Sequence, residues 1–159
     1  MLLEVFASSG NKIHIIGDGP LAALVIKAAE ANTNITYLGY REKSFISNEM
    51  KQCTALLFPS VCIETFGMTI IEAFSNGTAV IASDIGAATD LVTDNYNGMF
   101  FAHGNAVDLE TKCCLWLDTT TAEKNNFYKN CYSTFKEHYT PERNYQLLLT
   151  IYKKCLSQT

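Results

Sequence analysis

Short, almost uninterrupted apolar runs alternate with longer amphipathic stretches over most of the chain, and this alternation restricts the fold more than any other feature. An apolar run without alternating polar residues is typical of a strand buried on both faces, as in a parallel sheet. The expected strands are residues 12–17, 35–39, 55–60, 78–83 and 98–102, and the expected helices between them are 20–32, 44–53, 67–76 and 87–93. The pattern predicts an α/β fold with a doubly wound, mostly parallel sheet of about five strands.

Both ends of the chain depart from this alternation. Residues 1–10 have apolar side chains at helical spacing, so we expect a helix there, without the strand that usually opens a doubly wound fold. From residue 105 onward the pattern is helical only, and Thr120 with Glu123 predicts a capping box at the start of one of these helices. We expect a single domain over residues 1–159, made of an α/β core over 1–103 and a helical tail over 104–159.

Composition and charge exclude several classes of protein. The chain of 159 residues carries 12 basic and 16 acidic residues without a basic run, so a nucleic-acid groove is not expected. Its apolar stretches fall short of the ~18 residues that a membrane span requires, and its N-terminus lacks the basic segment of a signal peptide. The six cysteines form no Cys-x-x-Cys pair. We interpret them as small apolar residues in a reducing compartment, with the cytoplasm as the expected location.

Glycines and small polar residues follow the first four expected strands. They are Gly17, Asp18 and Gly19, then Gly39, Tyr40 and Arg41, then Pro59 and Ser60, then Ser83, Asp84 and Gly86. Ligands of open parallel sheets bind at the carboxyl ends of the strands, so these residues predict a ligand site. The Gly-Asp-Gly-Pro stretch alone is equally consistent with a tight turn. It also lacks the third glycine of a dinucleotide fingerprint, so NAD is not implied.

The stretch IETFGMTIIEAFSNG, residues 63–77, holds two glutamates in apolar surroundings, where burial of an unpaired carboxylate is costly. If the helix begins near Gly67, its first N–H groups form a site for a phosphate. Glu64, in the preceding loop, would then accept hydrogen bonds from sugar hydroxyls, and Glu72, in the second helical turn, from a ribose. The alternative for Glu72 is the solvated face of an otherwise apolar helix.

The segment PSVCIETFGMTIIEAFSNGTAVIASDIGAATDLVTDNYNG resembles the nucleotide-sugar-binding half of the group 1 retaining glycosyltransferases. Their signature is two glutamates separated by seven residues with Phe-Gly between them, here Glu64 and Glu72. The motifs IIGDGP, ITYLGY and GTAVIASD stand in the family's order. The resemblance covers residues 1–103 strongly and the tail loosely. It implies one of the two facing Rossmann-like domains of a GT-B enzyme, which transfers sugar from a nucleoside diphosphate such as a UDP-sugar, without a metal or other cofactor.

The resemblance also implies residue roles. Glu64 is the implied catalytic residue, in contact with the hydroxyls of the donor sugar. The amides near Gly67 would hold the diphosphate, Glu72 the ribose, and the backbone near Tyr40 the base, while Gly17 leaves room for the donor. The implied donor-binding residues are Gly17, Asp18, Gly19, Tyr40, Arg41, Ser60, Phe66, Gly67, Met68, Thr69 and Glu72.

Four features of the family are not matched. An arginine and a lysine that neutralise the diphosphate, and the acceptor-binding N-terminal domain, would both precede Met1. Ala87 replaces a common glycine and Asp90 a usual glutamate. We therefore expect the chain to be inactive by itself.

The expected partners are the donor and the acceptor-binding domain. The last helix is expected to leave an apolar face partly exposed or covered by a second copy, which makes a homo-oligomer possible; its residues are Tyr145, Leu148, Leu149, Tyr152 and Leu156. The full-length enzyme could touch a membrane surface without a transmembrane segment.

Two other functions are considered. The first is a sugar-nucleotide epimerase or phosphorylase of the same fold, which would place more acids and histidines at the ligand edge. Here only Glu64 is well placed, while His14 lies within an expected strand. The second is a receiver-type signalling module, which requires an aspartate where residues 55–60 have none.

Overall fold

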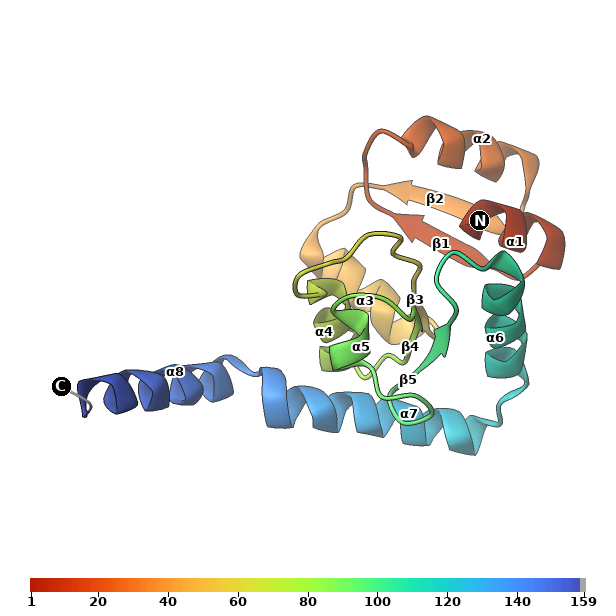
Figure 1. Ribbon diagram of the computed structural model, residues 1–159. Helices are drawn as coiled ribbons and strands as arrows, with labels where there is room; N and C mark the ends of the chain where they lie inside the picture. Colours follow the sequence, from red (N-terminus) through yellow and green to blue (C-terminus); the bar gives the residue numbers. More distant parts are fainter. Residues whose placement is uncertain (158–159) are drawn as a thin grey trace.

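Five parallel strands coincide with the five predicted apolar runs (Figure 1). The structure is a computed structural model and describes residues 1–157. The strands are β1 (Ile13–Ile16), β2 (Ile35–Gly39), β3 (Leu56–Phe58), β4 (Val80–Ser83) and β5 (Gly98–Phe101). Helices α1 (Leu2–Ser9), α2 (Ala22–Ala31), α3 (Lys43–Gln52), α4 (Met68–Ser75) and α5 (Ala88–Leu91) precede, connect and cover them. The predicted α/β class is confirmed.

The strands form two hydrogen-bonded groups, whereas the sequence predicts one sheet. β1 pairs with β2, and a separate group has the order β3-β4-β5. In Figure 1, β1 lies between β2 and the three-stranded group. A strand placed before α1 by a right-handed crossover would lie beside β1 at this division. Among residues 1–157 no strand occupies that position, so one edge of β1 and one edge of β3 are unpaired.

The first helix is present as predicted. α1 buries Val5 and Phe6, and it ends at Gly10, which has the left-handed conformation. The next helix, α2, begins at Ala22 rather than at residue 20, because Pro20 lies in the turn before it. None of the residues of α2 is buried.

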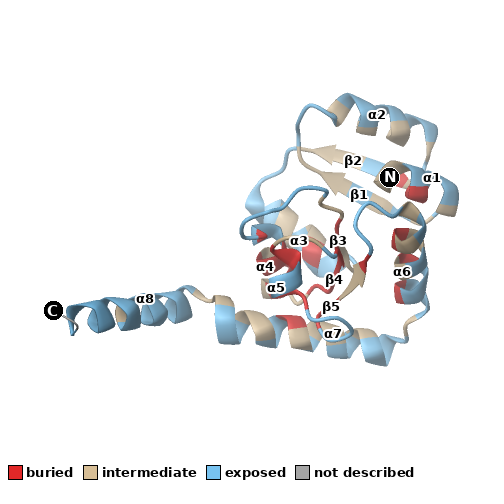
Figure 2. Ribbon diagram, viewed as in Figure 1, coloured by how far each residue is buried: buried red, intermediate tan, exposed pale blue. Residues whose placement is uncertain are grey.

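The hydrophobic core is centred on α4 and β4 (Figure 2). Ile70 and Phe74 of α4 and Val80 of β4 are fully buried. Each such side chain contributes about 1.5–3 kcal/mol by leaving water. The β1–β2 group has fewer buried residues, with Ile35 its one buried strand residue. The three-stranded group with α4 is therefore the more tightly packed part of the domain.

The predicted helical tail consists of α6 (Ala106–Asp118), α7 (Thr121–Thr134), a π-helical turn η1 (Phe135–Tyr139) and α8 (Pro141–Leu156). The Thr120–Glu123 capping box that begins α7 is present. Trp116 of α6 is buried, and its indole N–H donates to Thr54 Oγ1 over 2.9 Å. α6 and α7 thus pack on the core, whereas α8 extends away from it (Figures 1 and 2).

The cysteines, which the sequence analysis interprets as small apolar residues, divide into two groups by exposure. Cys113 and Cys131 are buried, but Cys53, Cys62, Cys114 and Cys155 are exposed, so only two of the six are core residues. Separately, none of the helices in the described part of the chain combines the length and apolar character that crossing a membrane requires.

Candidate functional site

The loops that follow β1 to β4 lie at the carboxyl ends of the strands, because all five strands are parallel. We call these loops, residues 17–19, 39–41, 59–67 and 84–87, the carboxyl edge. These loops contain every implied catalytic or donor-binding residue except Met68, Thr69 and Glu72, which belong to α4. The predicted residues therefore gather on one side of the domain.

Hydrogen bonds hold the strand ends together within each group of strands. In the first group, the Gly17 N–H donates to the Gly39 carbonyl and the Tyr37 hydroxyl donates to the Gly17 carbonyl, both over 2.9 Å. In the second group, the buried Ser83 hydroxyl donates to the Ser60 carbonyl over 2.7 Å. Within residues 1–157 no hydrogen bond joins the Gly17 turn to the Ser60 loop, since the division between β1 and β3 separates them.

Gly17 has an open position in the first group. Its φ of +135° is one that other residues rarely adopt, and a Cβ there would have no neighbour within 4 Å. The glycine is therefore required by the backbone and not by packing, and it leaves space above the turn. Next to it, the carboxylate of exposed Asp18 accepts a hydrogen bond from the Gly19 N–H over 2.8 Å.

Glu64 has a fixed backbone and an exposed side chain. Its carbonyl accepts a hydrogen bond from the Ala87 N–H over 3.2 Å, and a Cβ at Gly86 would lie 3.1 Å from the Glu64 nitrogen. The Ser60 hydroxyl lies 3.2 Å from Glu64 Oε1. Because the carboxylate is exposed, the burial cost considered from the sequence does not arise for Glu64.

Gly67 is the buried N-cap residue of α4, with φ +67° and ψ 44°. The positive φ favours glycine, and a Cβ at this position would lie 2.9 Å from Leu91 Cδ1, so the end of the Leu91 side chain would have to shift. Among residues 1–157 no acceptor takes the N–H groups of Met68 and Thr69, which are exposed. These first amides carry the positive end of the helix dipole and suit an anion.

Glu72 is half-buried in the second turn of α4, as its position in the sequence predicts. It lines a cavity of about 170 Å³ between α3 and α4. The neighbouring Asn76 side chain donates to the Glu72 carbonyl and accepts from the Ser47 hydroxyl, each over 2.7 Å. The polar side of α4 is therefore partly covered by α3 and is not simply a solvated face.

Lys43 is a residue that the sequence analysis missed. It is the first residue of α3 and lines the same cavity as Glu72. Its position two residues after Arg41, immediately behind a predicted ligand loop, was the available signal. Without the α3–α4 packing, nothing in the sequence connects Lys43 with Glu72.

The loop after β2 presents one aromatic and one basic side chain. Tyr40 is 70% exposed. The Arg41 guanidinium lies 5.4 Å from the centroid of the Phe45 ring and donates to the Tyr40 carbonyl over 3.1 Å. The cation–π contact holds Arg41 against α3. The histidine of β1, His14, is paired with Glu49 at 2.7 Å and is not part of the carboxyl edge.

The predicted site residues differ in exposure. Gly67 is buried; Gly17, Ser60 and Glu72 are half-buried; Asp18, Gly19, Tyr40, Arg41, Glu64, Phe66, Met68 and Thr69 are exposed. Along the chain, the first amides of α4 stand between two glutamates, Glu64 in the preceding loop and Glu72 in the second turn. Chemically, this arrangement can hold an anion with hydroxyl-bearing groups on either side.

Comparisons with known proteins identify the family to which the sequence is similar. Residues 1–134 match the sequence model of the family described as "Glycosyl transferases group 1". The chain is 29% identical to an uncharacterized glycosyltransferase of Methanocaldococcus jannaschii over 70% of its own length and 32% of the relative's. It is 26% identical to O-antigen chain mannosyltransferase C of Escherichia coli over 98% of its own length and 43% of that protein's.

The fold also matches solved structures. HepE of Anabaena in complex with UDP superimposes with a TM-score of 0.81 and 21% identity, covering 96% of this chain and 44% of HepE. The chain thus spans less than half the length of these relatives. The likeness establishes half of a GT-B architecture.

Proposed function

Because the chain belongs to the group 1 glycosyltransferase family, we propose that it is the part of a retaining enzyme that binds a nucleoside-diphosphate sugar for transfer to an acceptor. The observation that carries this proposal is the start of α4. The exposed N–H groups of Met68 and Thr69 lie between Glu64 in the preceding loop and Glu72 one turn into the helix. In a nucleoside-diphosphate sugar, the diphosphate lies between the transferred sugar and the ribose. This order of hydroxyl groups, anion and hydroxyl groups matches the order of Glu64, the α4 amides and Glu72 along the chain.

We assign the donor's parts accordingly. The diphosphate binds the α4 amides, Glu64 accepts hydrogen bonds from the transferred sugar and acts as the catalytic residue, and Glu72 accepts them from the ribose. Lys43 supplies positive charge beside the ribose. HepE, whose fold this chain matches, forms a complex with UDP, and a UDP-sugar is therefore the donor we propose to test first.

The other predicted donor residues complete this assignment. Tyr40 and Arg41 form the wall near the base, and residues 17–19 leave space for the sugar. Ser60 orients the Glu64 carboxylate through its hydroxyl. Phe66 is 58% exposed next to the helix start and shields the diphosphate from water. We propose that binding and transfer need no metal, and that EDTA leaves donor affinity unchanged.

We propose that transfer also requires an acceptor-binding domain facing the carboxyl edge. Positioning of the acceptor accounts for about 7–11 kcal/mol of a typical barrier, and every assigned residue here lies on the donor side. We take residues 1–159 as the donor-binding domain, with the core over 1–103 and the tail over 104–159. A radiolabelled-donor assay of this chain alone is expected to show no turnover; turnover comparable to a full-length relative would contradict this part of the proposal.

The apolar side chains of α8 form a surface that the acceptor-binding domain could contact. Tyr145, Leu148 and Tyr152 are 43% to 64% exposed. We propose that the acceptor-binding domain covers them or, in its absence, a second copy of the chain, which would give a homo-oligomer. Analytical ultracentrifugation tests the second case. We propose that the full-length enzyme is cytoplasmic and that its other domain touches a membrane surface.

Titration calorimetry with UDP, GDP and ADP tests the donor site directly. Glu72→Ala should weaken nucleotide binding, because the ribose loses its hydrogen-bond acceptor. Glu30→Ala is the matched control, since Glu30 is an exposed glutamate on α2, away from the α3–α4 cavity. Equal nucleotide affinity of wild type and Glu72→Ala would show that the ribose assignment is wrong.

A further inference from the structure

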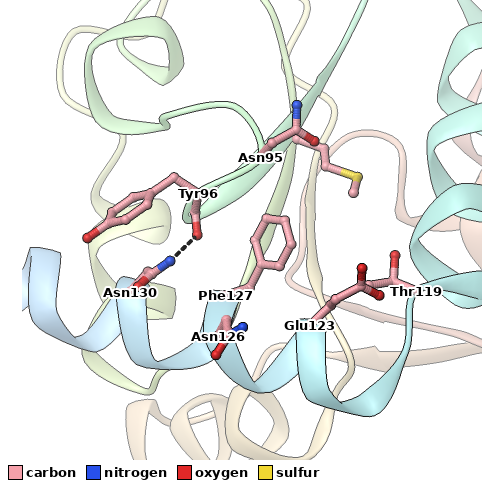
Figure 3. Close-up of a pocket in the computed structure, with 8 residues that line it drawn as sticks. Asn95, Tyr96, Thr119, Glu123, Asn126, Phe127 and Asn130 are labelled. Atoms are coloured by element: carbon pink, nitrogen blue, oxygen red, sulfur yellow. Dashed lines mark hydrogen bonds between the residues drawn. The ribbon is translucent and has the colours of Figure 1, made fainter.

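A second depression lies at the edge of the sheet opposite the carboxyl edge (Figure 3). It is formed by the turn over residues 94–97, which precedes β5, and by the face of α7 that packs beside this turn. Its volume is about 360 Å³, at the small end of the range of ligand pockets. Because β5 begins here and ends at the carboxyl edge, this pocket is separate from the proposed donor site.

The walls of this pocket, which we call the α7 pocket, are rigid. Asn95 has a φ of +57°, and its N–H donates to the Gly98 carbonyl over 2.9 Å. The Asn130 side chain donates to the Tyr96 carbonyl over 3.0 Å, as the dashed line in Figure 3 shows. Below it, the buried Cys131 thiol donates to the Asn97 carbonyl over 3.2 Å. The turn is therefore held to α7 at two points, which limits the movement of this wall of the pocket.

One aromatic ring and several neutral amides line the pocket. Phe127 points into it from α7 and is held by an edge-on contact with Trp116, with ring centroids 5.2 Å apart. Tyr96 contributes its carbonyl, which accepts from Asn130, whereas its ring extends away from Phe127 (Figure 3). Among residues 1–157, the Asn126 side chain takes part in no hydrogen bond, so its amide can both donate and accept.

The charge of the lining excludes anionic ligands. No lysine or arginine lines the pocket in the described part of the chain, and its one charged residue is Glu123. Hydrogen bonds from Thr120 lower the pKa of Glu123, so this carboxylate stays ionised at neutral pH. A phosphate or a uronic acid would meet repulsion without a compensating cation. A neutral ligand with hydroxyl groups meets both acceptors and donors.

We propose that the α7 pocket binds one or two residues of a neutral oligosaccharide. The hydroxyls pair with the Asn126 and Asn95 amides and with the Glu123 carboxylate, and the apolar face of a sugar ring lies against Phe127. The proposal is independent of the donor assignment, because none of its residues belongs to the carboxyl edge or to α4. It gives the domain a second contact with a glycan, away from the reacting sugar.

The test is an amide-resolved NMR titration of the whole chain with maltotriose and with α-linked mannotriose. At millimolar saccharide we expect saturable shifts confined to the 94–97 turn and the first three turns of α7. Addition of UDP should leave these signals in place, which separates this site from the donor site. A glucuronic acid oligomer is expected to give no saturable shift.

A pair of neighbouring asparagines provides the matched variants. Asn126→Ala should weaken saccharide binding about three- to tenfold through the lost hydrogen bonds. Asn125→Ala changes an exposed asparagine that does not line the pocket, so its affinity should equal wild type. Phe127→Leu, which keeps an apolar side chain at this position but removes the ring, should weaken binding as well. Non-saturable or scattered shifts, binding of the glucuronic acid oligomer with equal affinity, or equal affinities of the two asparagine variants would overturn the proposal.

Discussion

The Ser60 hydroxyl lies 3.2 Å from Glu64 Oε1 at the carboxyl edge, and the Ser83 hydroxyl fixes the Ser60 carbonyl over 2.7 Å. The end of β4 therefore positions a carboxylate in the loop after β3. The Ser60 hydroxyl also lies 3.1 Å from the Cys62 carbonyl, so its one proton is shared between this carbonyl and the exposed Glu64 carboxylate.

The position of this carboxylate predicts a selective effect of Glu64→Ala. The variant should bind UDP with wild-type affinity but lose about 1.5–3 kcal/mol of the affinity for a UDP-sugar, because only the sugar contacts this carboxylate in our assignment. Glu72→Ala should weaken both ligands. Titration calorimetry with UDP and UDP-glucose measures the two effects. A loss of UDP affinity in Glu64→Ala as large as the loss of UDP-glucose affinity would contradict the division of roles.

Replacement of Gly67 by alanine tests how the helix start is built. Gly67→Ala should lower the free energy of unfolding by about 2–4 kcal/mol, from backbone strain and from the clash with Leu91. Gly104→Ala is the control, because Gly104 has a similar φ of +70° but open space around a Cβ. Urea denaturation of both variants separates the cost of backbone strain from the cost of the clash with Leu91. Equal losses would mean that the packing against Leu91 contributes nothing.

The division between β1 and β3 predicts uneven amide hydrogen exchange. The Ile13 N–H donates to the Asn34 carbonyl of the neighbouring chain segment, whereas the next N–H, that of His14, points to the unpaired edge of β1. We expect His14 to exchange much faster than Ile13, and Ile81 of the central strand β4 to exchange slowest. Hydrogen exchange followed by NMR resolves the three sites. Equal protection of His14 and Ile81 would show that the edge is covered.

The capping box of α7 predicts a pH effect on stability. Hydrogen bonds from Thr120 lower the pKa of Glu123 in the folded state. A group with a lowered folded-state pKa stabilises the fold above its unfolded pKa, and this contribution disappears as the pH falls through the folded value. Glu123→Gln should therefore lose less stability between neutral and acidic pH than the wild type. Thermal unfolding over this range measures the difference, and an unchanged pH slope would contradict the assignment.

The cysteines should divide by reactivity. Burial raises the pKa of Cys131 to about 12 and that of Cys113 to about 11, so neither forms much of the reactive thiolate at neutral pH. Cys62 and Cys114 are exposed. Mass spectrometry after iodoacetamide treatment should find Cys62 and Cys114 alkylated first, with Cys113 and Cys131 modified only after unfolding. Early alkylation of Cys131 would show that the α7 packing opens readily.

Local patterns in the sequence determined much of this protein. The apolar runs located the five strands, the Thr-x-x-Glu pattern located the start of α7, and the Phe-Gly pair located the start of α4 within one residue. Each of these features depends on hydrogen bonds, backbone conformation or side-chain spacing within a few residues. The family resemblance, which rests on the same short motifs, was confirmed by the match over residues 1–134.

Only the tertiary structure decided the remaining features. It divided the sheet between β1 and β3, placed Lys43 beside Glu72, and left four of the six cysteines exposed. It also formed the α7 pocket from Tyr96 and Asn126, which lie on separate elements. These outcomes depend on which segments distant in the chain pack together. Side-chain spacing states which face of an element is apolar, but the burial and the neighbours of a residue are determined by the element that covers that face.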